Sequence, residues 1–451
     1  MTELRLFLVL ILVPTSVMAQ SGQAGVTLTA PLALDDLERM ALDNNPTLRQ
    51  AITGITAAQG RARQAGTWFN PTVGYSGEEI KPGEIIQLGE HGVFFDQQIP
   101  LGGKLRLSRQ IFEREAEQAV SLVDLQRERI LAAVRTLFYE ILTTERRVEV
   151  LDRLSQLASE AVGISRQLYN VGAADRPDVL DTEVEADRIQ LDLLAARNRR
   201  FALWRQLAVV IGTPALTPRP LAGDATILPE IGRDQALRDI LNRSPQIRVA
   251  RVEVERTRAI VARERRQPFP DLFVRVTPAY NRERLERAPG GGLRPIGWEL
   301  GALEAGVTVP LFNRNTGAIA AARAEQARAE AEVGRLELVT EARLAGVFEE
   351  YLTALRATEI YQTRVLPRAT ESYTLYLARY REMAAAYPQV LVAQRTLLQM
   401  TGQYFENLET TWRTALRIRG FLLDEDGLGA PMRAGEMDAD AFVRVAEGRE
   451  R

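Results

Sequence analysis

The feature that most constrains this chain is residues 104–169, a stretch without proline in which Gly163 is the one glycine. As a single helix it would extend about 100 Å at ~1.5 Å per residue, far beyond an ordinary globular helix. Apolar residues recur in a 4-3 spacing from Ile130 onward, and a second such seam begins at Val150. One seam suits a two-stranded coiled coil, whereas two seams indicate a neighbour on each side, as in a closed ring of helices. The alternative is a long helix in a soluble bundle or scaffold.

The composition excludes several classes of protein. Lys and Arg total 57 against 59 Asp and Glu, a net charge of -2, which gives no electrostatic case for binding nucleic acid. Without any cysteine the chain cannot form disulfides, thiolate metal sites or a lipidated N-terminal cysteine. A single histidine, His91, leaves no histidine-based metal cluster. We therefore predict no catalytic, cofactor-binding or metal site, and an enzyme using carboxylates alone is the weakest interpretation.

Residues 1–19 have the form of a secretory signal. Arg5 gives a weak basic start, residues 6–13 form an apolar core, and Ala19 ends a small-residue cleavage site. We predict cleavage there, with an uncleaved N-terminal anchor as the alternative. No later stretch approaches the ~18 apolar residues of a transmembrane helix, so any membrane crossing must be made by β-strands.

Two segments of the first half change to the period-2 alternation of β-strands. Residues 68–80 and 90–100 each hold about the 9–11 residues that a tilted transmembrane strand needs. Trp68 and Phe69 lie where an aromatic girdle would meet the membrane surface. A small soluble hairpin is the alternative, because alternation over this length is not specific to membrane strands.

The most informative feature is an internal repeat, in which a helix-helix-strand-strand-helix-helix plan occurs twice. Pro100 and Pro310, which end the strand pairs, are 210 positions apart. Tyr169 and Tyr380, near the ends of the long helices, are 211 positions apart. The repeat therefore predicts that both halves fold alike, with a longer loop inside the second strand pair.

The repeat also predicts the domain organisation. The first repeat covers residues 20–212, with strands at 68–80 and 90–100, a long helix at 104–169 and a return helix at 178–211. After a linker at 213–232, the second repeat covers 233–421, with strands at 270–281 and 298–310, a long helix at 315–381 and a return helix at 387–421. We expect residues 422–451 to be a flexible C-terminal tail.

The number of strands limits how they can be used. One chain offers four membrane-sized strands, which cannot close a barrel, and an open sheet edge cannot face lipid. Three copies would supply 12 strands, an ordinary even number for such barrels. The long helices leave from the same strand ends, so pooling the strands also pools the helices. We therefore predict a mainly α fold with a membrane β-barrel portion, assembled as a tube that acts as a conduit.

Two short motifs, each at a strand-to-helix junction, carry a resemblance to a known family. They are Gln-Ile-Pro-Leu-Gly-Gly-Lys at 98–104 and Val-Pro-Leu-Phe-Asn-Arg-Asn-Thr-Gly at 309–317. With the duplicated plan, they make the chain resemble the TolC family of outer-membrane efflux proteins over essentially its full length after the signal. The same motifs resemble most closely the cation-efflux, CzcC-like branch of that family.

The resemblance implies a homotrimer in the outer membrane of a Gram-negative bacterium, a 12-stranded β-barrel continued by a 12-helix periplasmic α-barrel. It implies a periplasmic adaptor and an inner-membrane pump of the resistance-nodulation-division type as partners, without catalysis. The expected cargo is heavy-metal cations, with drug efflux or type I secretion as alternatives. A soluble periplasmic coiled-coil scaffold is the alternative from another class. Without a lipidated cysteine, contact with outer-membrane lipid must rest on the barrel.

The resemblance also implies a narrowed periplasmic entrance at the helix tips. Tyr380 matches a family tyrosine, but Gln389 and Val392 stand where the family has aspartates. Because those positions have lost their charge, we place the entrance ring mainly in the first half. The candidate entrance residues are Asp175, Asp178, Asp181, Tyr380 and Gln389. For Asp175 and Asp178 the alternative is that they cap a helix N-terminus.

Two further groups of residues follow from the plan. The distal turns are the expected adaptor-docking tips: Val171, Gly172 and Ala173, and Met383, Ala384 and Ala385. In the family, an arginine is usual at the position of Ala385 and a glycine at that of Met383. The strand-to-helix hinges are Pro100, Gly102, Gly103, Pro310 and Asn313, since proline ends a strand ladder and glycine frees the backbone.

Overall fold

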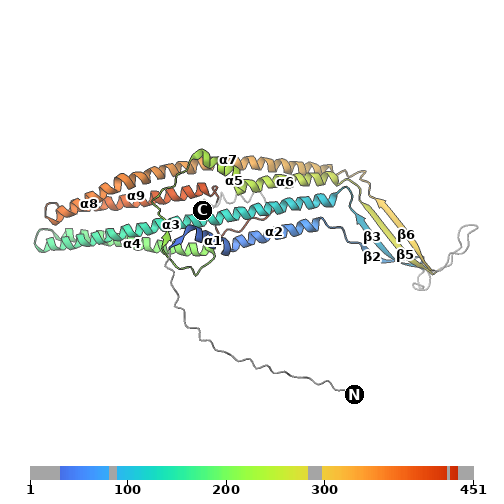
Figure 1. Cartoon of the computed structure of the whole chain (residues 1–451), viewed down its shortest axis with the longest axis horizontal. Helices are drawn as coiled ribbons and strands as arrows, with labels where there is room; N and C mark the ends of the chain where they lie inside the picture. The colour runs from blue at the N-terminus through green and yellow to red at the C-terminus, as the bar shows by residue number, and fades with distance from the viewer. Residues whose placement is uncertain (1–30, 81–88, 283–296, 424–426, 435–451) are drawn as a thin grey trace, which may run out of the picture.

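The computed structural model describes residues 31–80, 89–282, 297–423 and 427–434. The predicted signal at 1–19 and most of both hairpin loops lie outside these residues. The molecule is elongated, with four strands at one end and two helical hairpin tips at the other (Figure 1). Among the described residues, no helix is both long enough and apolar enough to cross a bilayer.

The two halves follow the same order of elements. The first contains β1 (Leu32–Ala33), α1 (Leu34–Asn44), α2 (Pro46–Ala65), β2 (Thr72–Glu78), β3 (Glu90–Ile99), α3 (Lys104–Asn170) and α4 (Arg176–Ile211). The second contains β4 (Leu221–Ala222), α5 (Arg233–Arg243), α6 (Pro245–Arg266), β5 (Leu272–Asn281), β6 (Gly297–Val307), α7 (Thr316–Ile360), α8 (Leu366–Arg381) and α9 (Tyr387–Arg419). Pro46 and Pro245 each stand at the first position of a helix, where a missing N–H costs nothing.

The second long helix differs from the continuous helix expected at 315–381. A π-helical turn, η1 (Tyr361–Val365), separates α7 from α8, and Pro367 follows in the first turn of α8. The repeat offset rises from 210 at the prolines before the long helices to 211 at their distal tyrosines, so the second helix holds one extra residue. A π-turn absorbs one residue inside a helix, and proline cannot donate the regular helical hydrogen bond. The extra residue and Pro367 therefore both interrupt the regular helix in the same short segment.

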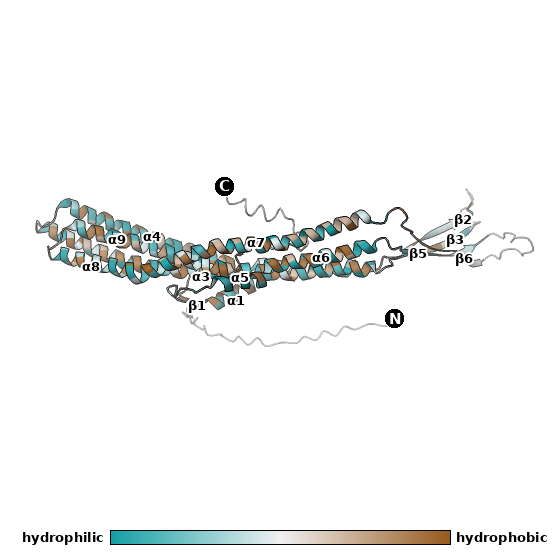
Figure 2. Ribbon diagram, turned by 90° about the horizontal axis from the view of Figure 1, so that it is seen from above, coloured by the Kyte–Doolittle hydropathy of each residue, from teal (hydrophilic) through white to brown (hydrophobic). Residues whose placement is uncertain are grey.

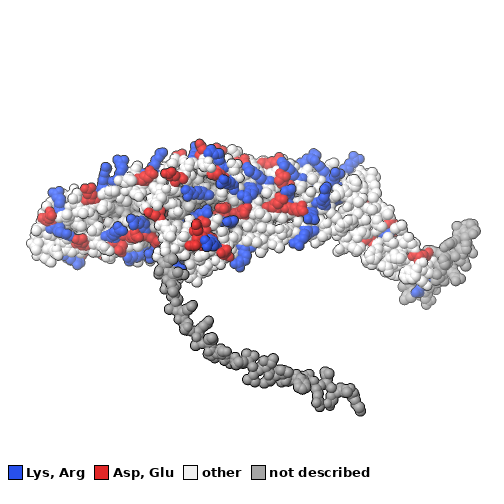
Figure 3. All heavy atoms as spheres, in the orientation of Figure 1, with Lys and Arg blue, Asp and Glu red and all other residues white. Residues whose placement is uncertain are grey.

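The four long strands form one antiparallel sheet in the order β2-β3-β5-β6, with β3 and β5 joining the two hairpins. Register and alternation give the sheet two chemically distinct faces. The apolar face exposes Val73, Tyr75, Val93, Phe95, Trp298, Leu300, Leu303 and Val307, and within these strands it carries no Asp, Glu, Lys or Arg. The opposite face carries Glu78, Glu90, Asp96, Arg275, Glu299 and Glu304. On the side in view in Figure 3, charged atoms crowd the helical body and are sparse over the strands.

The segment predicted as a linker at 213–232 is docked against the helices. Its strand β4 pairs in parallel with β1. The Trp412 indole N–H donates to the Ala225 carbonyl at 2.7 Å, and the Tyr139 ring stacks on Trp412 with centroids 3.6 Å apart. The Tyr351 hydroxyl donates to the Pro229 carbonyl. These bonds fix the connection between the two halves to the main core.

The expectation of a flexible tail from residue 422 onward is wrong for the part that the structure describes. Leu422 and Leu423 are buried, at 8% and 6% exposure. Beyond them, the Gly427 carbonyl accepts a hydrogen bond from the Asn45 amide at 3.0 Å, and the Gly429 carbonyl accepts one from Gln126 at 3.2 Å. The buried amides need these carbonyls, because an unpaired polar group in the core is costly. A glycine-rich composition did not reveal these bonds.

Candidate functional site

The two helical hairpins end in turns of the same construction, at the same end of the molecule (Figure 1). Gly172 has φ 76° and Met383 has φ 58°, so both occupy the left-handed region. Ala173 N–H donates to the Leu168 carbonyl and Ala384 N–H to the Arg379 carbonyl, both at 2.8 Å. This is the Schellman closure of a helix C-terminus. Of the six residues predicted as docking tips, all are exposed except Ala385, which is half-buried.

The acidic residues of the first tip have different roles. Asp175 and Asp178 form a capping box at the start of α4, in which the Asp175 N–H donates to the Asp178 carboxylate at 3.4 Å. Asp178 therefore has the capping role that the sequence left as an alternative. Asp181 is exposed one turn further along. Asp175 is exposed as well, so both can face an aqueous passage at the tip.

Tyr380 and Gln389 lie in different environments. Tyr380 is 4% exposed and lies inside the bundle, where its hydroxyl donates to the Ser165 hydroxyl at 3.4 Å. Gln389 is exposed in the first turn of α9. The structure therefore brings Tyr380 against α3 rather than beside the acidic residues on an open surface.

Three tyrosines fill the space between the hairpins near the tip. Tyr373, Tyr380 and Tyr387 are all under 5% exposed, and the rings of Tyr380 and Tyr387 have centroids 5.7 Å apart. Burial raises the pKa of Tyr387 to about 12, and the nearby carboxylates of Glu185 and Asp181 act in the same direction. Burial also raises the pKa of Tyr373. These phenols stay neutral over the physiological range and act as packing groups.

Two ion pairs that the sequence analysis missed join the hairpins. Glu185 on α4 is 2% exposed, and its carboxylate accepts from Arg395 on α9 at 2.7 Å. Arg381 on α8 pairs with Glu160 on α3. Glu185 and Arg395 are 210 positions apart, whereas the repeat offset in this part of the chain is 211, so the duplication does not indicate this pair.

The first strand-to-helix hinge is held by one carboxylate. Asp271 accepts the Leu101 N–H at 3.1 Å and the Lys104 ammonium at 2.9 Å. Gly102 and Gly103 have φ 70° and 75°, and a Cβ at Gly102 would lie 3.0 Å from the Phe269 side chain. Glycine is therefore required here for both its dihedral angle and its size. The predicted hinge after Pro100 is thus held by Asp271, the residue directly before β5 in the other half.

The second hinge uses asparagine in place of glycine. Asn315 has φ 57° immediately before α7, and its side-chain amide donates to the Glu264 carboxylate at 2.7 Å. The Asn313 side chain accepts the Asn315 N–H at 3.1 Å. Asparagine occurs in the left-handed region several-fold more often than most other residues, and here the bond to Glu264 holds its side chain. Asn313 and Asn315 together make the turn that follows Pro310.

The polar face of the sheet carries a charge ladder. Arg275 on β5 contacts Asp96 on β3 at 3.2 Å and Glu304 on β6 at 3.9 Å, and its guanidinium lies 4.8 Å from the centre of the Phe94 ring. On the other face, the Tyr75 hydroxyl lies 2.6 Å from His91 Nδ1. Throughout residues 31–80, 89–282, 297–423 and 427–434, no cluster of three or more His, Asp or Glu side chains could hold a metal ion.

Comparison with known proteins agrees with this arrangement. The outer membrane efflux protein family matches residues 37–213 and 236–418, one segment in each repeat. The chain is 24% identical over 391 residues to the cobalt-zinc-cadmium resistance protein CzcC of Cupriavidus metallidurans, covering 86% of this chain and 89% of that protein.

Solved structures share the fold. The outer-membrane channel OprN superposes with a TM-score of 0.70 at 17% identity, covering 88% of this chain and 91% of that one. CusC, described as forming a transmembrane channel, superposes with a TM-score of 0.68 at 14% identity, covering 88% and 92%. The family match spans both repeats and accounts for the paired strand hairpins and the long helical hairpins. The chain belongs to the outer membrane efflux protein family.

Proposed function

We propose that three copies of this chain form the outer-membrane duct of a tripartite efflux pump. The observation that carries the proposal is the two-faced sheet, apolar on one side and acidic on the other, with β2 and β6 as open edges. An apolar face suits lipid, a polar face suits an aqueous lumen, and joining the open edges of three sheets would satisfy the unpaired strand groups. The long helices then continue the passage into the periplasm.

The proposed cargo is heavy-metal cations. The similarity to a cobalt-zinc-cadmium resistance protein supports this cargo, and so does the charge of the inner face. That face carries five carboxylates against Arg275, namely Glu78, Glu90, Asp96, Glu299 and Glu304. A lumen lined by carboxylates favours cations and disfavours anions.

The proposed duct catalyses no reaction, and its partners supply the energy. We assign the adaptor contact to the exposed turns around Gly172 and Met383, and the inner-membrane partner to a resistance-nodulation-division pump. Exposed Asp175 and Asp181 would form rings of three carboxylates at the periplasmic entrance. Asp178 would support such a ring by capping α4 rather than by facing the passage.

Planar-bilayer recording of the full chain, purified from outer membranes, tests this proposal. We expect pores with a reversal potential favouring cations, and a lower cation preference after Asp181→Asn. Asp234→Asn on α5, far from the tips, is the matched control and leaves the preference unchanged. A purified chain without conductance, found in the soluble periplasm, would instead identify a helical scaffold. Anion preference, or no rise in cobalt, zinc or cadmium resistance when the pump is supplied, would exclude the metal cargo.

A further inference from the structure

The helical body meets the sheet at a junction where α2 and α6 end and α3 and α7 begin (Figure 2). We define this junction as residues 61–71, 100–109, 261–271 and 309–316. In the proposed duct the apolar face of the sheet contacts lipid. The junction then lies at the membrane surface nearest the helices, at the height of the lipid headgroups.

The junction is strongly basic, although the whole chain is slightly acidic. It contains nine Lys and Arg residues and two acidic residues, a net charge of +7, whereas the chain has a net charge of -2. Both acidic side chains are already paired within the copy, Asp271 with Lys104 at 2.9 Å and Glu264 with Arg263. In Figure 3, basic side chains gather at the end of the helical body next to the strands. The positive charge of the junction therefore exceeds what its own carboxylates neutralise.

More than half of the junction's basic residues are arginines without a carboxylate partner. Among the described residues, five exposed arginines of the junction form no ion pair within the copy: Arg63, Arg106, Arg265, Arg266 and Arg314. Basic residues close to a membrane surface are attracted to anionic lipids over about one Debye length. A guanidinium group also binds phosphate oxygens in a bidentate manner. The junction thus carries the charge that an anionic headgroup requires.

A cavity of about 870 Å³ opens at the junction, between α2, α3 and α6. Its apolar lining includes Phe112 on α3, with Trp68 and Phe69 from the segment before β2. Its polar lining includes Ser108 and Arg263. The cavity is therefore amphipathic, and it combines a basic group with aromatic surface as a phospholipid headgroup and the adjoining part of its acyl chains require.

The aromatic side of the cavity lies toward the apolar face of the sheet. Trp68 and Phe69 are 63% and 51% exposed, and tryptophan is enriched where a membrane meets water. The Phe69 carbonyl accepts a hydrogen bond from the Gln97 side-chain amide at 3.0 Å. By alternation along β3, Gln97 shares the sheet face of Val93 and Phe95, which is the apolar face. A lipid beside that face can therefore reach the cavity.

Two arginines stand at the cavity. Arg263 lines it, and its Nε donates to the Ser108 hydroxyl at 3.2 Å. Arg109 lies one helical turn beyond Leu105, another lining residue, and a Cβ at Gly66 would lie 3.0 Å from the Arg109 side chain. Arg109 is 59% exposed, and its pair with Glu113 is an exposed pair within one helix. Such a pair is weak, so this guanidinium can exchange its carboxylate for a phosphate.

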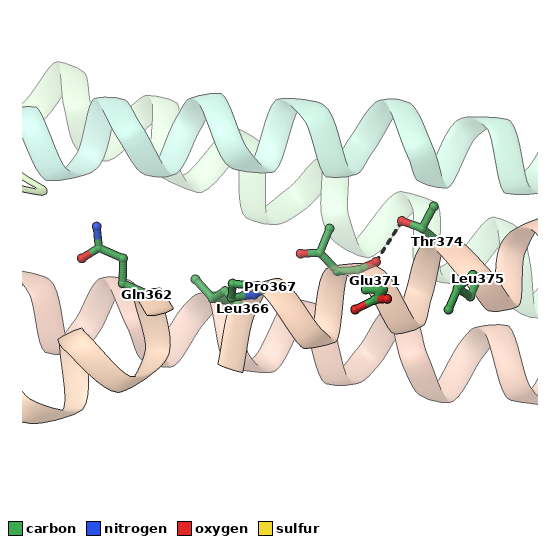
Figure 4. A pocket seen from close by; sticks show the side chains of 7 residues that line it. Gln362, Leu366, Pro367, Glu371, Thr374 and Leu375 are labelled. Atoms are coloured by element: carbon green, nitrogen blue, oxygen red, sulfur yellow. Dashed lines mark hydrogen bonds between the residues drawn. The ribbon is translucent and has the colours of Figure 1, made fainter. Parts of the chain in front are cut away.

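The cavity on α8 beside the π-turn has a different lining (Figure 4). It measures about 570 Å³ and is lined by Leu366, Pro367 and Leu375 together with Gln362 and Glu371. Its lining residues include no Lys, Arg or aromatic side chain, and Glu371 would repel a phosphate. Volume alone therefore does not select an anionic lipid, and of these two cavities the one at the junction has the matching chemistry.

We propose that the junction cavity binds an anionic phospholipid from the leaflet nearest the helices, with phosphatidylglycerol as the expected kind. The phosphate contacts Arg109 and Arg263, and the start of an acyl chain lies along Phe112, Trp68 and Phe69. The five unpaired arginines add attraction to the same leaflet. The proposal rests on the proposed outer-membrane duct. It gives a chain without any cysteine a non-covalent attachment to lipid in addition to its strands.

Native mass spectrometry of the full chain, purified as its assembly in detergent, tests the lipid preference. The probes are dioleoylphosphatidylglycerol and dioleoylphosphatidylcholine, which have the same acyl chains but differ in net charge. We expect the natural chain to retain more phosphatidylglycerol. Arg109→Gln with Arg263→Gln should lower the affinity for it about fivefold for each arginine removed. The charge-keeping pair, Arg109→Lys with Arg263→Lys, should retain most of the preference.

A matched control removes two arginines from the same helices away from the cavity. Arg114 and Arg258 each form an exposed ion pair three residues along one helix, with Glu117 and Glu255. Arg114→Gln with Arg258→Gln should bind phosphatidylglycerol as the natural chain does. Equal losses in the control and in the cavity variant would overturn the site. Equal retention of both lipids by the natural chain would overturn it as well.

Tryptophan fluorescence tests where the lipid binds. Trp204 and Trp412 are 2% and 5% exposed, so Trp298→Phe leaves Trp68 as the exposed tryptophan of the described residues. Bromine atoms on acyl chains quench tryptophan on contact. In this variant, brominated phosphatidylglycerol should quench more strongly than brominated phosphatidylcholine, and the added change Arg109→Gln with Arg263→Gln should abolish the difference. Equal quenching by the two lipids in the variant with both arginines would contradict binding at this cavity.

The outcomes separate this inference from the proposed function. Pores in planar bilayers without a preference for phosphatidylglycerol would overturn the lipid site and leave the duct. A chain found in the soluble periplasm without conductance would remove both. Retention of lipopolysaccharide in place of phosphatidylglycerol would assign the arginines to a lipid of the opposite leaflet and also overturn the site.

Discussion

The first hairpin reaches its tip through one uninterrupted helix, α3, whereas the second reaches it through α7, a π-turn and α8. Both tips nevertheless end in the same turn and lie at the same end of the molecule (Figure 1). The two halves differ by one residue between hinge and tip, and the π-turn takes up that residue. The hinge and the tip thus fix the length that each long helix must span. A local irregularity such as the π-turn lets a helix with one extra residue span that same length.

The tips themselves differ in chemistry. The first has glycine at the left-handed position and a capped return helix, with Asp175 and Asp178 forming the capping box. The second has Met383 in the same conformation, and Ala386 begins α9 without a side-chain cap. The second tip therefore depends more on tertiary contacts, namely the buried tyrosines and the ion pairs of Arg381 and Arg395.

The largest expected effect comes from deleting one residue in each long helix. Deleting Arg153 from α3 rotates everything after it by about 100° and removes Ile164 and Leu168 from the core, at a cost of more than about 4 kcal/mol. Deleting Thr363 together with Pro367→Ala should cost within about 1 kcal/mol, because the π-turn becomes regular helix. Denaturant unfolding followed by helical circular dichroism measures both. Equal costs would mean that the π-turn is not an absorbed insertion.

Removing the arginine of the buried ion pair is expected to have the next largest effect. Arg395→Ala leaves the buried Glu185 carboxylate with only Arg188, 3.9 Å away, and should cost about 2–3 kcal/mol, less than the loss of a fully buried partner because Arg395 is about half exposed. Arg413→Ala, whose pair with Glu350 is exposed, is the control and should cost under about 0.5 kcal/mol. Unfolding midpoints in urea compare the two variants. Similar losses would show that Glu185 is not held by Arg395.

Exchanging the residues at the left-handed tip positions should shift stability in opposite directions. Gly172→Ala should cost about 1 kcal/mol, and Met383→Gly should gain up to about 1 kcal/mol, because a Cβ is disfavoured at positive φ. Thermal unfolding of the two variants against the natural chain checks the signs. If Met383→Gly also weakens adaptor binding, the exposed Met383 side chain is part of the docking surface.

The smallest effect at neutral pH is expected for Tyr387→Phe. The folded chain keeps this phenol protonated up to a pKa of about 12, while the unfolded chain releases the proton near its ordinary value of 10. Between these values the unfolded state binds fewer protons, so folding stability falls as pH rises. Below about pH 10 the variant should match the natural chain, and above it the variant should lose less stability. An unchanged alkaline slope in the variant would contradict the burial of Tyr387.

Much of the fold could be predicted because its signals are local. The spacing of apolar residues predicts a helix at 104–169 that the structure has as Lys104–Asn170, and alternation predicts strands whose ends lie within four residues of those of β2 and β3. The glycines at 102, 103 and 172 lie at positive φ, as their places in turns suggested. The two-faced sheet follows from alternation as well, once the register is known.

The candidate site was harder to predict because its roles depend on which side of a helix faces a neighbour. Tyr380 is buried against α3, and Asp178 caps a helix, although both lie in the sequence beside exposed tip residues. The Glu185–Arg395 pair joins helices from different repeats, so no local pattern indicates it. The docked tail failed as a prediction for the same reason, since the Asn45 and Gln126 amides that bind it lie far away in the sequence.

By itself the sequence determined the period of each segment, the duplication and the family, because these depend on residue spacing along one chain. Only the tertiary structure showed the π-turn, the position of both helical tips at the same end of the molecule, the buried Glu185–Arg395 pair and the packing of residues 427–429 against the core. Each of these features depends on residues that are distant in the sequence, which either supply a hydrogen-bond or ion-pair partner or limit the length of a helix.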